Sequence, residues 1–241
     1  MSVSKRRVRA IFRKELREYR RNGFIVLTMA VFPLIFLIQP LVVVFALPAS
    51  AVAELSHEHL LLYMLGIPAI VPAAVAAYAV VGERQQSTLE PVLTTPIRRE
   101  EFLLGKALAA LVPSVAIAYA VYAVFLACVG LFASPAVAST LIRAPDLLAQ
   151  LLFTPLLAGW SIWLGMAISA RSSDFRVAQQ LSTLVSLPAA LVAALIAFDV
   201  IHATLGLALC LAAALLVLDG LGWRIMSATF DRERLITGTR P

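Results

Sequence analysis

Six long apolar runs dominate the sequence, and short polar segments separate them. Each run is almost free of charged residues and is long enough to cross a bilayer, because a helix needs about 20 apolar residues to span ~30 Å of hydrocarbon. We therefore predict an all-α, polytopic membrane protein. The predicted spans are about 24–47, 60–81, 104–131, 147–170, 178–198 and 203–223.

The first 22 residues follow a different pattern, because apolar side chains recur there at steps of three and four. Nine of the twenty Lys and Arg residues occupy the other positions of this segment. The pattern favours a helix lying along the cytoplasmic membrane surface, where anionic lipid attracts its bases. A disordered basic tail that only sets the topology is the alternative. The apolar positions are Val8, Ile11, Phe12, Leu16 and Tyr19.

The distribution of basic residues predicts the orientation of the chain in the membrane. Nineteen Lys and Arg residues lie in the N-terminal segment, the 82–106 and 171–176 loops and the 224–241 tail, and only Arg143 lies on the other side. Cytoplasmic loops carry such an excess, so we expect a plasma-membrane protein with both termini in the cytoplasm. The bases lie beside spans and do not form a basic surface with interleaved aromatics, so no nucleic-acid partner is expected.

One polar segment interrupts the apolar pattern most strongly. Residues 82–106 read Gly-Glu-Arg-Gln-Gln-Ser-Thr-Leu-Glu-Pro-Val-Leu-Thr-Thr-Pro-Ile-Arg-Arg-Glu-Glu-Phe-Leu-Leu-Gly-Lys. Thr88 or Ser87 can cap a short helix over 89–93, and Thr95 followed by Pro96 gives a second helix start. We predict a short helix crosswise beneath the membrane that turns sharply into the third span. Its mixed charges suit salt bridges to a soluble protein, although a solvated loop is the alternative.

The spans offer few groups for ion coupling or metal binding. Ionisable groups in a membrane interior are usually functional. Asp219 lies near the inner end of the sixth predicted span, whereas Asp199 and His202 lie near the outer surface of the membrane. His57 and His59 flank a carboxylate in an outer loop without a further ligand nearby in sequence, so no metal site is expected. A proton- or ion-coupled carrier is therefore disfavoured.

Two catalytic possibilities also fail on their residue patterns. The Glu100–Glu101 pair resembles that of an intramembrane metalloprotease, but no histidine lies in the core of any span to complete a zinc site. The Gly105–Lys106 pair lacks both the preceding glycine and the following Ser or Thr of a phosphate-binding loop. If the protein moves a solute uphill, its energy must come from a partner.

Residues 82–106 resemble the signature segment of type-2 ABC transporter permeases. The segments 172–188 and 230–235 resemble the second inner loop with the fifth span, and the tail, of the same family. Arg98 replaces a common serine, so we expect the helix cap at Thr95, and Gln85 and Gln86 replace residues that are often charged.

The resemblance implies a non-catalytic membrane subunit of an exporter. Two copies of a separate ABC ATP-binding subunit would carry ATP and magnesium, this chain would bind no cofactor, and a second, identical or different, permease subunit would complete the transporter. The residues that would couple to the ATPase are Glu83, Arg84, Thr88, Leu89, Glu90, Leu93, Thr95, Pro96, Arg99, Glu101 and Lys106. The second inner loop would contribute Arg171, Asp174 and Arg176.

The translocation path should be apolar, because the spans contain few polar groups, and this suits lipids, hydrophobic drugs or other amphiphiles. Prolines are expected to interrupt five spans. The candidate path residues are Phe125, Trp160, Trp163, Pro68, Pro72 and Pro188. A non-transporting scaffold or assembly factor is the alternative function, and a channel is a more distant one.

Overall fold

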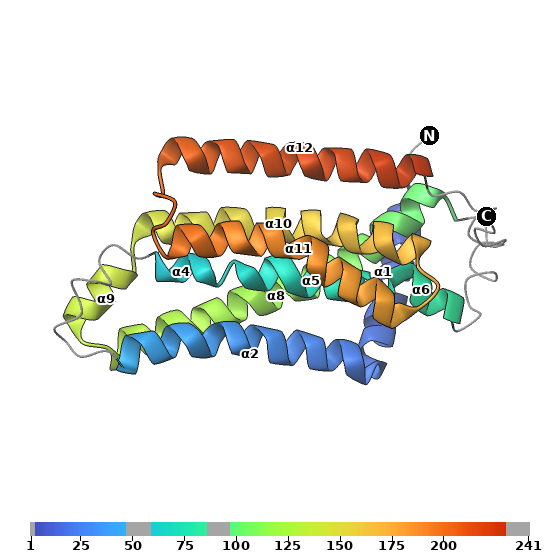
Figure 1. Cartoon of the computed structure of the whole chain (residues 1–241). Helices are drawn as coiled ribbons and strands as arrows, with labels where there is room; N and C mark the ends of the chain where they lie inside the picture. Colours follow the sequence, from blue (N-terminus) through green and yellow to red (C-terminus); the bar gives the residue numbers. More distant parts are fainter. Residues whose placement is uncertain (1–2, 47–58, 86–96, 230–241) are drawn as a thin grey trace.

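The computed structural model describes residues 3–46, 59–85 and 97–229, and every regular element in this part of the chain is a helix (Figure 1). The helices are α1 (Lys5–Arg21), α2 (Gly23–Ala46), α4 (Leu60–Tyr63), α5 (Gly66–Ala76), α6 (Tyr78–Gln85), α8 (Arg99–Phe132), α9 (Pro135–Leu141), α10 (Ala144–Arg171), α11 (Phe175–Ala197) and α12 (Leu205–Thr229).

The prediction of an all-α protein with six membrane spans is confirmed. Six stretches of helix are long and apolar enough to cross a bilayer, and they run side by side along the molecule (Figure 1). The second span is made of three consecutive helices, α4, α5 and α6, whereas each of the others is one helix. Their bounds are Gly23–Ala46, Leu60–Gln85, Arg99–Phe132, Ala144–Arg171, Phe175–Ala197 and Leu205–Ser227.

The helix of the third span begins earlier than the predicted span at about residue 104. The helix α8 continues unbroken from Arg99 to Phe132, and its 34 residues make it about 50 Å long. The N-cap of α8 is Arg98, whose backbone is extended, and not the predicted Thr95; Thr95 and Pro96 themselves lie outside the described residues. The physical reason is the Glu101 side chain, which accepts the Arg98 N–H at 3.0 Å and so caps the helix at this later point.

The second span forms the centre of the bundle. In its most apolar stretch 94% of the residues are buried, compared with at most 44% in the other spans. Its middle helix α5 packs against α2, α8, α10 and α11, and every one of its residues is buried. A helix that is apolar on all sides is expected at such a central position.

Small and polar residues of α10 allow a close approach to the second span. The Ser161 hydroxyl donates to the Ala69 carbonyl at 2.6 Å, and Ser169 accepts two backbone N–H groups of α6 at 3.0 Å each. A Cβ atom on Gly165 would come within 2.6 Å of the Ala73 carbonyl oxygen. Such small residues are typical of tightly packed membrane helices.

The expectation that prolines interrupt five spans is wrong for four of them. The second span alone is divided, at residues 64–65 and 77, on either side of Pro68 and Pro72. The other helices continue through their prolines, which membrane helices tolerate because local adjustments and neighbouring groups satisfy the freed carbonyls. These continuous helices contain Pro33 and Pro40 in α2, Pro113 in α8, Pro155 in α10 and Pro188 in α11.

Candidate functional site

The N-terminal helix α1 lies at the end of the bundle opposite α9 and packs on the first turns of α8 (Figure 1). Its Val8, Ile11 and Tyr19 side chains are buried, and Phe12 packs beside them. The contact is closest at Gly105, where a Cβ atom would lie 2.7 Å from the Ile11 side chain. Much of the apolar face of α1 is therefore covered by protein, and contact of the helix with the membrane surface stays a prediction.

A buried group of charges joins α1 to both ends of the polar segment 82–106. Lys106 of α8 donates to Glu15 of α1 at 2.7 Å and to Glu83 of α6 at 3.0 Å. The three side chains are 0%, 1% and 4% exposed. Breaking a buried ion pair by removing one partner costs about 3–5 kcal/mol, because the remaining charge is left without compensation. This group therefore favours one fixed arrangement of the three helices.

Lys14 adds a second cation at the edge of this group. Its ammonium lies 2.5 Å from Glu83 and 3.1 Å from Glu18, and its side chain is partly exposed. Burial by itself acts to lower the pKa of Lys14, but the carboxylates of Glu15 and Glu83 outweigh it and raise that pKa above its ordinary value. We call Glu15, Glu83, Lys106 and Lys14, with Glu18 at the rim, the ionic cluster.

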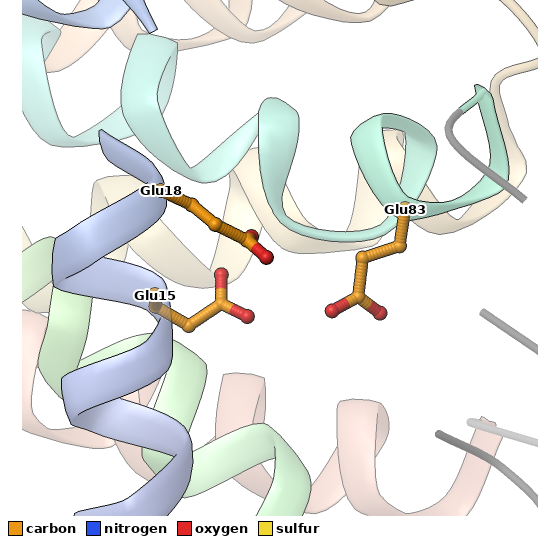
Figure 2. A group of neighbouring side chains, drawn as sticks. All are labelled: Glu15, Glu18 and Glu83. Atoms are coloured by element: carbon orange, nitrogen blue, oxygen red, sulfur yellow. The ribbon is translucent and has the colours of Figure 1, made fainter. Parts of the chain in front are cut away.

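The carboxylates of the ionic cluster have the spacing of cation ligands. Figure 2 shows Glu15 and Glu18 of α1 and Glu83 of α6, and one oxygen from each lies within 4.8 Å of the others. Lys106 and Lys14 already lie at hydrogen-bond distance from these oxygens. A divalent ion would have to share the space with two ammonium groups, so the chemistry of this cluster is ion pairing.

Glu101 connects the start of α8 to the start of α1. Besides the Arg98 N–H, it accepts the backbone N–H of Ser4 at 2.9 Å and the Arg7 guanidinium at 3.3 Å. The carboxylate thus also lies near the N-terminus of α8, where negative charge is stabilised by the helix dipole. Glu101, like Glu83 and Lys106, is engaged inside the chain.

Two arginines attach the ends of the polar segment to other spans. Arg84 donates to the Ser172 and Ala170 carbonyls at the end of α10, at 2.8 and 3.3 Å. Arg99 donates to the Ser227 carbonyl near the end of α12 at 2.9 Å. A cation is favourable at a helix C-terminus because it compensates the last carbonyl groups. The ends of the segment therefore contact α1, α10 and α12.

The second inner loop is short and lies between α10 and α11. Asp174 caps α11 by accepting the N–H groups of Arg176 and Val177 at 2.7 and 3.2 Å. Arg171 donates to the Ala167 carbonyl at 3.2 Å, and both arginines are exposed. Exposed bases on a capped helix end are available to a partner.

The middle of the polar segment lies outside the described residues. This applies to the predicted helix over 89–93 and to six of the predicted coupling residues, namely Thr88, Leu89, Glu90, Leu93, Thr95 and Pro96. The other five, Glu83, Arg84, Arg99, Glu101 and Lys106, are the ones whose contacts are given above. The structure thus brings together the two ends from which the middle part must extend.

The predicted path residues do not gather around one space. Phe125, Pro68 and Pro72 are buried in the interior, whereas Pro188 is exposed on α11. Trp160 is half-buried, and Trp163 packs edge to face on Trp223 of α12 with ring centres 5.8 Å apart. None of the six predicted residues lines either of the two cavities described below.

The sequence interpretation missed Glu15 and Lys14. The signal was present, because Glu15 lies four residues from both Ile11 and Tyr19 and so shares the apolar face of the N-terminal helix. A carboxylate on an apolar face is unfavourable unless a buried cation meets it. Lys106, at the start of an apolar run, was the available partner.

Comparison with known proteins agrees with this architecture. Residues 6–202 match the family model described as ABC-2 type transporter, a range that includes α1 from its second residue, the polar segment and the first five spans. No curated protein shows significant similarity to the chain. Because the match covers most of the sequence, the chain belongs to the ABC-2 type transporter family and is a membrane-spanning permease subunit of an ABC transporter.

Proposed function

We propose that this permease exports a hydrophobic or amphiphilic substrate and that two copies of an ATP-binding subunit drive it through the segment 82–106. The observation that carries the proposal is the ionic cluster. Its Glu83 and Lys106 stand at the two ends of the segment, and Glu15 ties both to α1. A partner that displaced the segment would therefore move α1, α6 and α8 together.

The length of α8 supports transmission to the opposite side of the membrane. The helix is about 50 Å long and unbroken, whereas the hydrocarbon layer is only ~30 Å thick. The closely packed contact of α10 with the second span couples that span to a further helix. We infer that ATP-driven motion at the segment tilts the second and third spans and opens an outward path.

We place this path at a groove between α2 and α11. The groove has a volume of about 520 Å³ and is lined mainly by apolar side chains. Gln179, Gln180, Thr183 and Thr28 also line it. Polar side chains in a membrane normally face a protein neighbour or an aqueous space rather than lipid. A second permease subunit that covers this face would leave a mostly apolar path with a few hydrogen-bonding groups between the subunits.

Charge reversal in the loop tests the coupling role. Glu90→Lys should reduce co-purification of the ATP-binding subunit, and it should lower ATP-dependent efflux of a fluorescent amphiphile from cells, or its ATP-dependent uptake into inverted vesicles. The matched control is Glu58→Lys, the same change in the loop predicted on the other side of the membrane. Equal behaviour of the two variants would contradict coupling through this loop. A wild-type chain that binds no ATP-binding subunit would favour the scaffold alternative.

A further inference from the structure

A second cavity, with a volume of about 740 Å³, lies among α4, α10, α11 and α12. It is at the end of the bundle away from α1 and is separate from the ionic cluster and from the α2–α11 groove. Its size is within the range of sites for small molecules. The helix α12 packs chiefly against α10, and side chains of α10, α11 and α12 line the cavity.

The depth of the cavity corresponds to one leaflet of a membrane. Its lining extends along α10 from Ala144 to Leu157 and along α12 from Leu205 to Leu215. At 1.5 Å per residue these stretches are about 20 and 15 Å long, which is half to two-thirds of the ~30 Å hydrocarbon layer. The cavity therefore begins near the membrane surface and ends near the bilayer centre.

The cavity is open on the side where lipid would lie. The side chains of Leu148 and Leu152 on α10 and of Leu205 and Leu209 on α12 line it and are also exposed. An exposed leucine in a membrane helix faces hydrocarbon at no cost, and the opening between them admits a flexible apolar chain from the bilayer. A polar solute would reach this entrance only through lipid.

Polar groups line the cavity at its outer end. The imidazole Nδ1 of His59 lies 2.8 Å from the Asp146 carboxylate, which is itself buried. A carboxylate has two acceptor oxygens, and one of them accepts the Nδ1–H of His59, so further acceptor capacity is left at this end of the cavity. Thr204 completes this polar end and accepts the N–H of Leu207 at 3.2 Å. The polar end thus suits a ligand head that donates hydrogen bonds.

We propose that the cavity binds a resident phospholipid of the adjoining leaflet. One acyl chain occupies the apolar space, and an ammonium head, as in phosphatidylethanolamine, donates to the His59–Asp146 pair. The bound lipid fills the space between α11 and α12 and fixes the position of the sixth span. The inference concerns a single copy of the chain and does not depend on the export direction, the ATP-binding partner or the α2–α11 path.

The test uses the full-length protein reconstituted in vesicles with photoactivatable phospholipids. Phosphatidylethanolamine and phosphatidylcholine probes carry the same reactive acyl chain, and mass spectrometry locates the labelled residues. We expect labels on α10 and α12 within the cavity and several-fold more label from the ethanolamine probe. The double variant His59→Ala/Asp146→Ala should abolish this preference but retain labelling by the acyl chain.

Filling the cavity provides the decisive comparison. Ala208→Phe places a ring in the space and should reduce labelling several-fold, whereas Ala213→Phe puts the same ring on an exposed position of the same helix and should not. Ala149→Leu is a milder filling variant if Ala208→Phe fails to fold. Equal labelling of filled and control variants overturns the proposal. An unlabelled cavity in the wild type, as when a second copy of the chain covers it, overturns it too.

Discussion

Lys106 holds a full charge in the interior of the bundle, where an ammonium group is unfavourable without partners. Two carboxylates and the ring of Phe102, 5.0 Å from the ammonium, surround it. The lysine therefore depends on α1 and α6 as much as they depend on it. The stability of the protein should therefore depend more on the charge of the side chain at position 106 than on its size.

Replacement of Lys106 by methionine keeps most of the side-chain volume and removes the charge. We expect Lys106→Met to destabilise the protein by about 3–5 kcal/mol, because Glu15 is left buried with Lys14 as its one cation among the described residues. Thermal unfolding in detergent measures the change. The control is Lys5→Met, at an exposed position of α1. The double variant Lys106→Met/Glu15→Met should recover part of the loss, and an unchanged melting temperature in Lys106→Met would contradict this account.

The docking of α1 on α8 requires a position without a side chain. Gly105→Val should displace α1, because even a Cβ atom would lie 2.7 Å from Ile11. Limited proteolysis should then cleave within α1 more rapidly than in the wild type. The same substitution at Gly130 of α8 meets no atom within 4 Å and should leave α1 protected. Equal protection of α1 in both variants would show that this contact does not hold the helix.

Alkaline pH should also release α1, because two of its groups hold their protons more strongly in the folded protein. Burial, and then the nearby carboxylates of Glu15 and Glu18, raises the pKa of Tyr19, and the pKa of Lys14 is raised as described above. The contribution of each group to the stability of the folded protein is complete below its ordinary pKa near 10. It is lost as the pH rises above that value toward the raised pKa of the folded protein.

The measurement is the rate of proteolysis of α1 between pH 8 and pH 11. Tyr19→Phe removes one titrating group, and the Tyr19 hydroxyl has no hydrogen-bond partner among the described residues. We expect this variant to keep α1 protected to higher pH than the wild type. Identical profiles would assign the whole effect to Lys14.

At the scale of the elements, most of the helices can be predicted from the sequence. The apolar runs predict all six spans, and the three- and four-residue steps predict the N-terminal helix, because each signal is local. No helix was predicted between the third and fourth spans, but α9 forms there, with Ser134 as its N-cap and Pro135 as its first residue. The apolar-face pattern indicates that Glu15 needs a buried cation, but the contact distances to Lys106, and the pairing of His59 with Asp146, could not be predicted, because they depend on how distant helices pack.

At the scale of the whole molecule, the proposed dimer places the α2–α11 groove between two subunits. After Cys128 and Cys210 are replaced by serine, Gln180→Cys should form a disulfide between two copies in membranes, because Gln180 is exposed beside the groove. Ala213→Cys on the exposed face of α12 should not. Non-reducing gels distinguish the two results, and cross-linking of both or of neither would argue against this subunit interface.

The complete burial of α5 has a consequence for biosynthesis. This helix is made early, but the helices that cover it most extensively, α10 and α11, leave the ribosome only near the end of the chain. Until then the Ala69 carbonyl and the N–H groups of Val80 and Val81 lack the serines of α10 that they contact in the finished protein. Until α10 and α11 are made, the second span must therefore lie in the lipid or beside an insertion factor. Chains truncated before residue 144 should be degraded, because they cannot bury this span.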